Sequence, residues 1–205
     1  MVAKHADRLL GRFAVDSGWN PMLPVPVERI ADHCDLGILW EPISEPLGQT
    51  ILAGLDPTGR LIIFNERRRS LFDSTPFLYN TVLAHELGHW HLHVDHTLLE
   101  YPLLPGFHRP FQFVCQRGGD AWEERHAAQF MSHLLLPRYL LSAGLVDVEI
   151  TSLAGMYHFR DRYQVTITAM RIALESLGRG YVDDDGRVHP SKAEFHGQMR
   201  LLSKL

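Results

Sequence analysis

The sequence predicts an α+β fold with a small antiparallel sheet and a helical core, followed by a helix-turn-helix-like C-terminal region. Three observations support this prediction: a strand–turn–strand pattern, a helical segment with a His-Glu-x-x-His motif, and two helical patterns after Pro137. With 205 residues, of which 45% are hydrophobic, the chain is long enough to bury a substantial core. We place the boundary between the two domains at residues 145/146, which gives domains of residues 1–145 and 146–205.

Composition and charge exclude several classes of partner. The formal net charge of −4 gives no basic character that would favour nucleic acid or an anionic membrane as the main partner. Cys34 and Cys115 are the only cysteines and do not form a Cys-x-x-Cys pair, and no secretory signal pattern precedes them. No apolar run approaches membrane-spanning length. We therefore expect a soluble, cytoplasmic protein with reduced thiols and no membrane contact.

Apolar periodicity and turn residues predict two helices and three strands in the first part of the chain. The expected helices cover residues 3–15 and 27–33, and the expected strands cover residues 37–40, 50–55 and 60–64. The last two strands should form a hairpin, because residues 56–59 read Asp-Pro-Thr-Gly, which are turn residues. Residues 65–73 are expected to be a charged connection to the next helix.

The His-Glu-x-x-His motif lies in residues 83–93 and predicts half of a zinc site. A helix turns about 100° per residue, so His85 and His89, four positions apart, lie on one face and can reach one ion. Glu86 lies beside them and can reach a water molecule on that ion. Zinc hydrolases divide the work in this way: neutral nitrogens hold the metal, and a carboxylate outside the ligand set takes the proton.

Local signals support a helix around the motif. Thr75 is the expected N-cap, with Pro76 at the first helical position. Apolar residues then recur at i, i+4, i+7 and i+11 and predict a core-facing stripe that excludes the two histidines: Leu83, Leu87, Trp90 and Val94. The alternative is a surface helix with incidental histidines. Residues 94–119 follow, rich in proline and aromatic residues, and are either a lid or substrate rim or a disordered insertion.

The second helix expected to contribute a ligand covers residues 120–136. Asp120 fits an N-cap and Glu123 fits position N3 of a variant capping box, which leaves Glu124 one position further round. Small or flexible residues follow Glu124 on its face and would let the helix approach the motif helix closely: Ala127, Ala128 and Met131. We therefore predict Glu124 as the third ligand and prefer it to Glu123. A solvated surface glutamate is the alternative.

The segment after Pro137 has a different pattern. Helical patterns cover residues 149–159 and 166–177, with Gly178 and Gly180 as stop signals, and a small hairpin is expected at residues 181–188. Such a helix-turn-helix-like unit can bind DNA, pack on a partner or support the first domain. We rank DNA contact below packing, because Arg171 is the only basic residue on the second helix.

Taken together, the motifs resemble those of the ImmA/IrrE family of bacterial metallopeptidases. The resemblance rests on four stretches between about residues 20 and 180: residues 25–31, 83–93, 124–137 and 153–178. It implies a thermolysin-like zincin core that uses Zn²⁺ and cleaves a helix-turn-helix repressor, relieving repression of a mobile element or a stress response. His85 and His89 match the family's histidine ligands, Glu86 its catalytic glutamate and Glu124 the glutamate of its second signature.

Two positions depart from the family pattern. Ala128 stands where the family usually carries Asn or Asp, and His126 stands where it often carries Glu. A polar residue at position 128 can orient a ligand histidine, and its loss typically costs about 10- to 100-fold in metal affinity or activity. Either zinc is held less tightly here, or another residue performs the orienting.

The remaining site residues stay open at this level. An oxyanion needs an electrophilic donor, for which Tyr101, His108 and His126 are equivalent candidates. His93 is either a third nitrogen ligand or a residue that packs against or hydrogen-bonds a ligand, and we favour the latter. The rival to the peptidase is a catalytically weak binding module that grips a repressor or antitoxin partner, with DNA contact through the C-terminal helices. A structural zinc protein would normally need four protein ligands.

Overall fold

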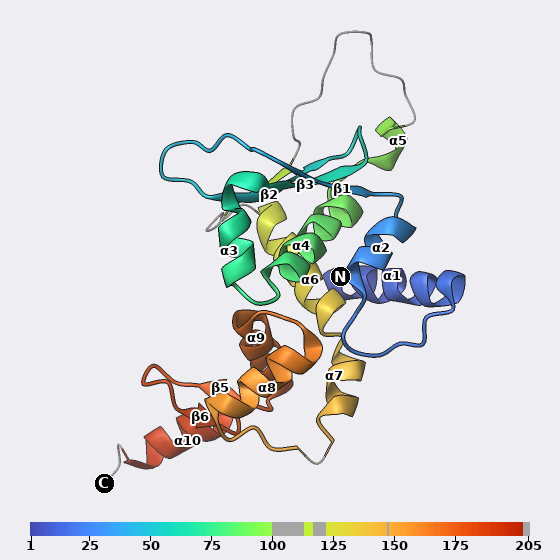
Figure 1. Cartoon of the computed structure of the whole chain (residues 1–205). Coiled ribbons are helices and arrows are strands. Elements are labelled where there is room, and N and C mark those ends of the chain that lie inside the picture. Colours follow the sequence, from blue (N-terminus) through green and yellow to red (C-terminus); the bar gives the residue numbers. More distant parts are fainter. Residues whose placement is uncertain (100–112, 117–121, 147, 203–205) are drawn as a thin grey trace. The chain divides into compact units, whose positions relative to one another are not determined.

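The computed structural model describes residues 1–99, 113–116, 122–146 and 148–202 (Figure 1). The chain forms two compact units, which are described separately below. The N-terminal unit combines Met1–Asn20 with Pro26–Leu135, and the C-terminal unit combines Pro21–Val25 with Leu136–Leu205. The predicted α+β class with a small sheet is confirmed.

The sheet of the N-terminal unit is mixed, so the prediction of an antiparallel sheet was wrong at one edge. Its strands are β1 (Gly37–Glu41), β2 (Ile51–Asp56), β3 (Leu61–Asn65) and β4 (Phe113–Gln116), in the order β1-β3-β2-β4. The predicted hairpin β2–β3 is confirmed as antiparallel, and β4 also runs antiparallel to β2. However, β1 pairs in parallel with β3 rather than with β2, its neighbour in sequence. The hairpin places β3 between β1 and β2, and this arrangement is invisible to strand periodicity.

Two side chains hold the connections of this sheet in place. The Asp56 carboxylate accepts hydrogen bonds from the backbone N–H groups of Thr58 and Gly59, both at 3.0 Å, and so closes the hairpin turn. Asn65 at the end of β3 is fully buried. Its side-chain oxygen accepts from the backbone N–H of Ile43 at 3.0 Å, and its side-chain nitrogen donates to the carbonyl of Ile51 at 2.9 Å. Asn65 therefore ties the connection between β1 and β2 to the sheet.

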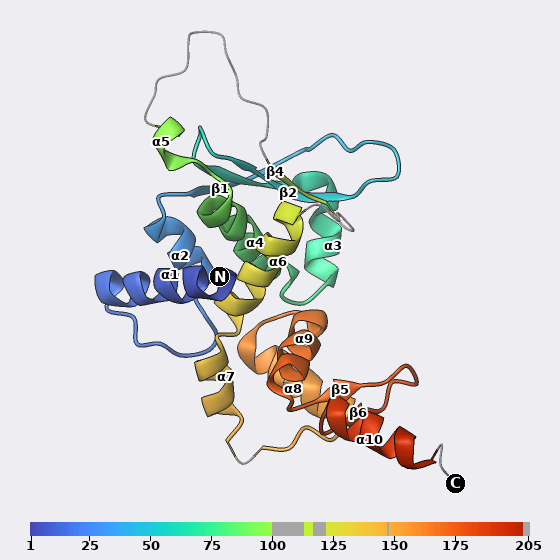
Figure 2. The same cartoon turned by 180° about the vertical axis from the view of Figure 1, so that it is seen from behind.

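Helices cover one face of the sheet. Figures 1 and 2 show α4 and α6 side by side against it, with α1 and α2 further along the same unit. The helices of the unit are α1 (Val2–Ser17), α2 (Val27–His33), α3 (Arg69–Ser74), α4 (Leu78–Leu92), α5 (His96–Leu99) and α6 (Trp122–Leu135). Residues 65–73, predicted as a charged connection, instead form a 3₁₀ turn at Glu66–Arg68 and α3. The Asn65 side chain caps this turn by accepting from the N–H of Arg67.

The motif helix α4 begins later than predicted. Thr75 ends α3, and Phe77, with a left-handed φ of 61°, is the N-cap of α4, so Pro76 is not the first helical residue. The predicted core-facing stripe is confirmed, because Leu83, Leu87, Trp90 and Val94 are all buried. Burial also continues right round the helix from Val82 to Trp90. The surface-helix alternative is therefore wrong, and the motif side chains lie inside the unit.

The C-terminal unit consists mainly of short helices. They are α7 (Arg138–Gly144), α8 (Leu153–Tyr163), α9 (Ile167–Leu177) and α10 (Lys192–Leu202), with a hairpin of β5 (Tyr181–Val182) and β6 (Val188–His189). Ser152 caps α8 by accepting from the N–H of Gly155, which is why this helix begins later than the predicted residue 149. Thr166 caps α9 in the same way, and Gly178 ends α9 in a left-handed conformation. The periodicity did not predict α7 or α10. Among the described helices, none is long and apolar enough to cross a membrane.

Candidate metal centre

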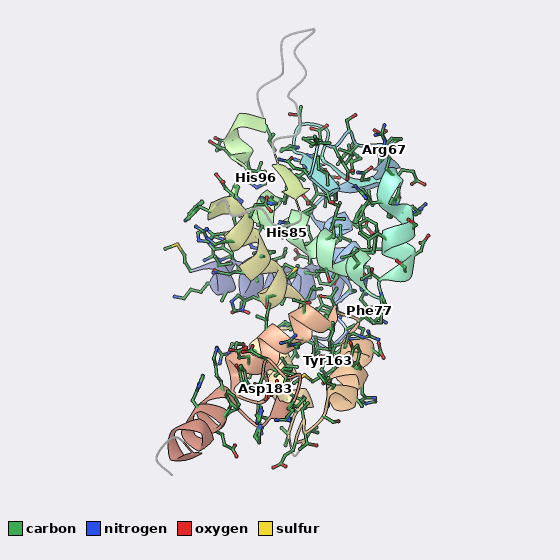
Figure 3. All side chains as sticks on the ribbon, turned by 90° about the vertical axis from the view of Figure 1, so that its left-hand side faces the viewer. Arg67, Phe77, His85, His96, Tyr163 and Asp183 are labelled. Atoms are coloured by element: carbon green, nitrogen blue, oxygen red, sulfur yellow. The ribbon has the colours of Figure 1, made fainter. Side chains whose placement is uncertain are left out.

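Helix α4 brings two imidazoles together. His85 and His89 lie one turn apart, and their Nε2 atoms are 3.1 Å from each other. Their ring planes are inclined by 69°, so the two rings meet edge to face and do not stack. Figure 3 shows His85 in the interior of the N-terminal unit. The spacing of four residues therefore produces the convergence that the sequence predicted for a helix.

Helix α6 contributes the third group, Glu124. Its Oε2 lies 3.1 Å from Nε2 of His85, and its Oε1 lies 3.2 Å from Nε2 of His89. One ligand atom from each of the three residues lies within 4.8 Å of the others, an arrangement that could hold a metal ion. Glu123, the alternative that we ranked second, is exposed in the first turn of α6. The structure thus brings together the three residues predicted as ligands.

Glu124 can reach the imidazoles because α4 and α6 approach each other very closely. A Cβ placed on Gly88 would lie 2.9 Å from the Cα of Ala127 and 3.0 Å from its carbonyl oxygen. Gly88 lies between the two motif histidines in sequence, and Ala127 lies one helical turn after Glu124. The sequence pattern predicted the small residue on α6 but not its glycine counterpart on α4, although that glycine stands inside the motif.

Electrostatics keep Glu124 and His89 in the states that a cation needs. Burial raises the pKa of Glu124, but hydrogen bonds and positive charge from His85 and His89 outweigh it and bring the value to about 2. Burial lowers the pKa of His89, and the hydrogen bond to Glu124 only partly opposes this effect. Near neutral pH, Glu124 is therefore an anion and His89 is a neutral imidazole with a lone pair to share.

Glu86 differs from every other carboxylate of the described chain in its surroundings. It is fully buried, and neither of its carboxylate oxygens has a hydrogen-bond donor among the described residues. Burial, and then the negative charge of Glu124, raise its pKa well above the ordinary value. A buried carboxylate that accepts no hydrogen bond destabilises the fold, and such groups are typical of catalytic and binding sites.

His93 contacts a ligand histidine from behind. Its Nδ1 lies 3.1 Å from Nδ1 of His89, on the opposite side of that ring from Glu124. Burial, and then the neighbouring His89, lower the pKa of His93 to about 4, so the ring is neutral. Its Nδ1 can therefore accept a hydrogen bond from the Nδ1–H of His89. The half-buried Ala128 offers no polar group for this purpose. The structure thus places His93 as a hydrogen-bond partner of His89.

The other predicted residues do not join this group. His126 packs on Trp122, with ring centroids 4.1 Å apart, and lies parallel to the ring of His93 at 6.3 Å. Tyr101 and His108 lie outside the described residues, as do Asp120 and most of the segment 94–119. The choice of oxyanion donor and the nature of that segment therefore stay predictions.

Comparison with models of known protein families gives no match, and comparison with curated proteins gives none either. The family resemblance and the activity that it implies therefore rest on the sequence motifs alone.

Proposed function

We propose that this chain is a zinc-dependent endopeptidase that cleaves a helix-turn-helix repressor and thereby relieves repression of a mobile element or a stress response. The observation that carries the proposal is the convergence of His85, His89 and Glu124 from two helices, with Glu86 buried beside them. A possible metal site is compatible with many functions. The added carboxylate of Glu86 is what favours hydrolysis over metal storage or a purely structural role.

The donor set fits zinc. Ligand bonds of 2.0–2.2 Å in a tetrahedral site place neighbouring ligand atoms about 3.3–3.6 Å apart. The two Nε2 atoms here are 3.1 Å apart, and each lies 3.1 or 3.2 Å from one of the two carboxylate oxygens of Glu124. These separations are close to that range, so small adjustments would bring both nitrogens and one carboxylate oxygen to bonding distance of one ion. Two nitrogens and one carboxylate are common ligands of catalytic zinc, and three protein ligands leave a fourth position open. When bound, zinc would supply a Lewis acid that lowers the pKa of water and polarises a carbonyl group.

The chain's own residues would manage the protons. The raised pKa of Glu86 makes its carboxylate a stronger base than an exposed glutamate, and general bases work best when their pKa lies near the working pH. Glu86 would accept a proton from the attacking water at a carboxylate oxygen and deliver it to the departing amine. His93 would accept the Nδ1–H of His89, which fixes the tautomer of that ring and leaves its Nε2 unprotonated.

The substrate class comes from the sequence resemblance. A repressor encoded beside the gene for this chain is the first substrate to test. Incubation of the zinc-loaded protein with that repressor should yield two fragments, and a chelator should stop the cleavage until zinc is restored. Glu86→Gln should bind zinc as the wild type does but cleave nothing. Cleavage by Glu86→Gln at the wild-type rate, or cleavage that a chelator does not affect, would refute the proposal.

A binding module is the second candidate, favoured by the lack of a polar group at Ala128. In that case the chain would form a stable complex with the repressor or an antitoxin partner without cutting it. The C-terminal helices give little support for added DNA contact. The exposed face of α9 carries Arg171 together with Glu175, and Glu175 pairs with Lys192 at 2.8 Å. Co-elution with the repressor without fragments, in the presence of zinc, would favour this candidate.

A further inference from the structure

A second concentration of polar side chains lies in the N-terminal unit, at a pocket that involves none of the metal ligands. The pocket has a volume of about 380 Å³ and is formed by α1, α4 and α5. Its lining consists of His5, Arg8, Leu9, Arg12, His91 and His96. Leu9 is buried and is the apolar part of the lining, and every other lining residue is basic. Among the described residues, no carboxylate lines this pocket, although the chain as a whole carries a net charge of −4.

Among the described residues, neither of the two arginines of this pocket forms an ion pair. Arg8 and Arg12 are exposed on α1, one helical turn apart, and no ion pair links either to a carboxylate among the described residues. Like charges at this spacing destabilise a helix by a few tenths of a kcal/mol. Asp16, one turn beyond Arg12, lies 3.6 Å from Nε2 of His33 instead. The sequence thus places two permanent cations next to each other at a position where neutral residues would give a more stable helix.

Three histidines complete the polar lining of the pocket: His5, His91 and His96. His96 is oriented by donating from Nε2 to the carbonyl of Trp90 at 3.0 Å, and Figure 3 shows it at α5, of which it is the first residue. His91 is half-buried, with its Nε2 3.4 Å from Sγ of Cys34. The pocket lining therefore combines side chains from α1, α4 and α5, with Arg8 and Arg12 as its permanent cations.

We propose that this pocket binds a small phosphate-type oxyanion, such as the phosphate group of a monoester or a diphosphate. Planar guanidinium groups donate paired hydrogen bonds to phosphate oxygens, and two of them one turn apart can grip one such group. A volume of about 380 Å³ lies in the lower part of the usual range for small-molecule pockets, roughly 300–1,000 Å³. The bound anion would relieve the repulsion between Arg8 and Arg12, and α1 would couple ligand binding to the stability of the unit.

The test uses the full chain with inorganic phosphate and pyrophosphate as probes, measured by calorimetry and by thermal shift. Both anions should bind the wild type and raise its melting temperature, pyrophosphate more strongly, with the effect weakening as salt rises. The double variant Arg8→Gln with Arg12→Gln should lose roughly 100-fold or more in affinity, as expected for two charge-assisted contacts. Its own melting temperature should not fall, because glutamine is a good helix former and the repulsion is gone.

A matched control removes two positive charges from the C-terminal unit. This double variant, Arg171→Gln with Arg187→Gln, should bind both anions as the wild type does. Equal binding by the Arg8/Arg12 double variant would overturn the proposal, and so would an absence of binding to the wild type at millimolar anion. Binding that a chelator abolishes, while the double variant retains it, would place the anion on the metal centre instead. Capture of a DNA duplex but not of pyrophosphate would replace the small-anion proposal with a nucleic-acid one.

Discussion

Replacement of Gly88 by alanine should weaken metal binding much more than it destabilises the fold. A Cβ at this position would lie 2.9 Å from the Cα of Ala127, whereas ordinary contacts of a Cβ begin at 3.4 Å. The two helices must therefore part locally by about 0.5 Å, the difference between these distances. Glu124 lies one turn from Ala127 on the same helix and should move by a similar amount. Metal–ligand distances tolerate deviations of only about 0.2 Å, so the displacement is large enough to weaken coordination.

The cost to folding should be smaller. Overpacking of a core costs about 1–3 kcal/mol, and replacing a helical glycine by alanine returns about 1 kcal/mol. We therefore expect Gly88→Ala to lose about 0–2 kcal/mol of unfolding free energy but about 10- to 100-fold in zinc affinity. Denaturant unfolding and competition with a chromophoric chelator measure the two quantities.

The control for this prediction is Gly11→Ala on α1, where an added Cβ meets nothing within 4 Å. It should gain up to about 1 kcal/mol in stability and keep its zinc affinity. Wild-type zinc affinity in Gly88→Ala would refute the claim that the contact between α4 and α6 sets the ligand geometry.

Three further changes test separate parts of the structure. The pKa of Glu124 in the folded chain, about 2, lies below its ordinary value of 4.5, so its stabilising contribution is present above pH 4.5 and is lost as the pH falls towards 2. In chelator-treated protein, the difference in urea midpoint between the wild type and Glu124→Gln should therefore shrink from pH 5 to pH 2.5; a constant difference would argue against the ion pairs. His93→Phe should weaken zinc binding about 10- to 100-fold with little change in melting temperature, and unchanged affinity would remove its role behind His89. Asn65→Ala should cost about 2–4 kcal/mol, measured by denaturant unfolding, because it leaves two buried backbone groups without partners.

Local sequence signals determined much of the secondary structure and one half of the site. The spacing of His85 and His89 fixes their convergence as soon as the segment is helical, because helix geometry is the same in every protein. The hairpin β2–β3 follows equally from its turn residues. These features depend on residues a few positions apart, and a sequence pattern reports such neighbours directly.

Errors arose where one local signal was compatible with two structures, or where pairing depended on another segment. Thr75-Pro76 is a good helix start in isolation, but α3 uses Thr75 as its end, and α4 begins only after the left-handed Phe77. The parallel pairing of β1 with β3 depends on which strand the hairpin places next to β1. Helix α4 is also buried on more sides than its apolar stripe predicted, because burial of the other side depends on segments elsewhere in the chain.

By itself, the sequence determined that two imidazoles and a neighbouring carboxylate share one helix, and it pointed to Glu124, which lies close to both imidazoles in the fold. Tertiary structure alone decided how that third group reaches the pair: the close contact of Gly88 with Ala127 sets the distance between the two helices. It also decided that His93 lies behind His89 and that Glu86 is enclosed without a donor. Ligand distance and burial depend on packing between segments remote in sequence, and no local periodicity encodes that packing.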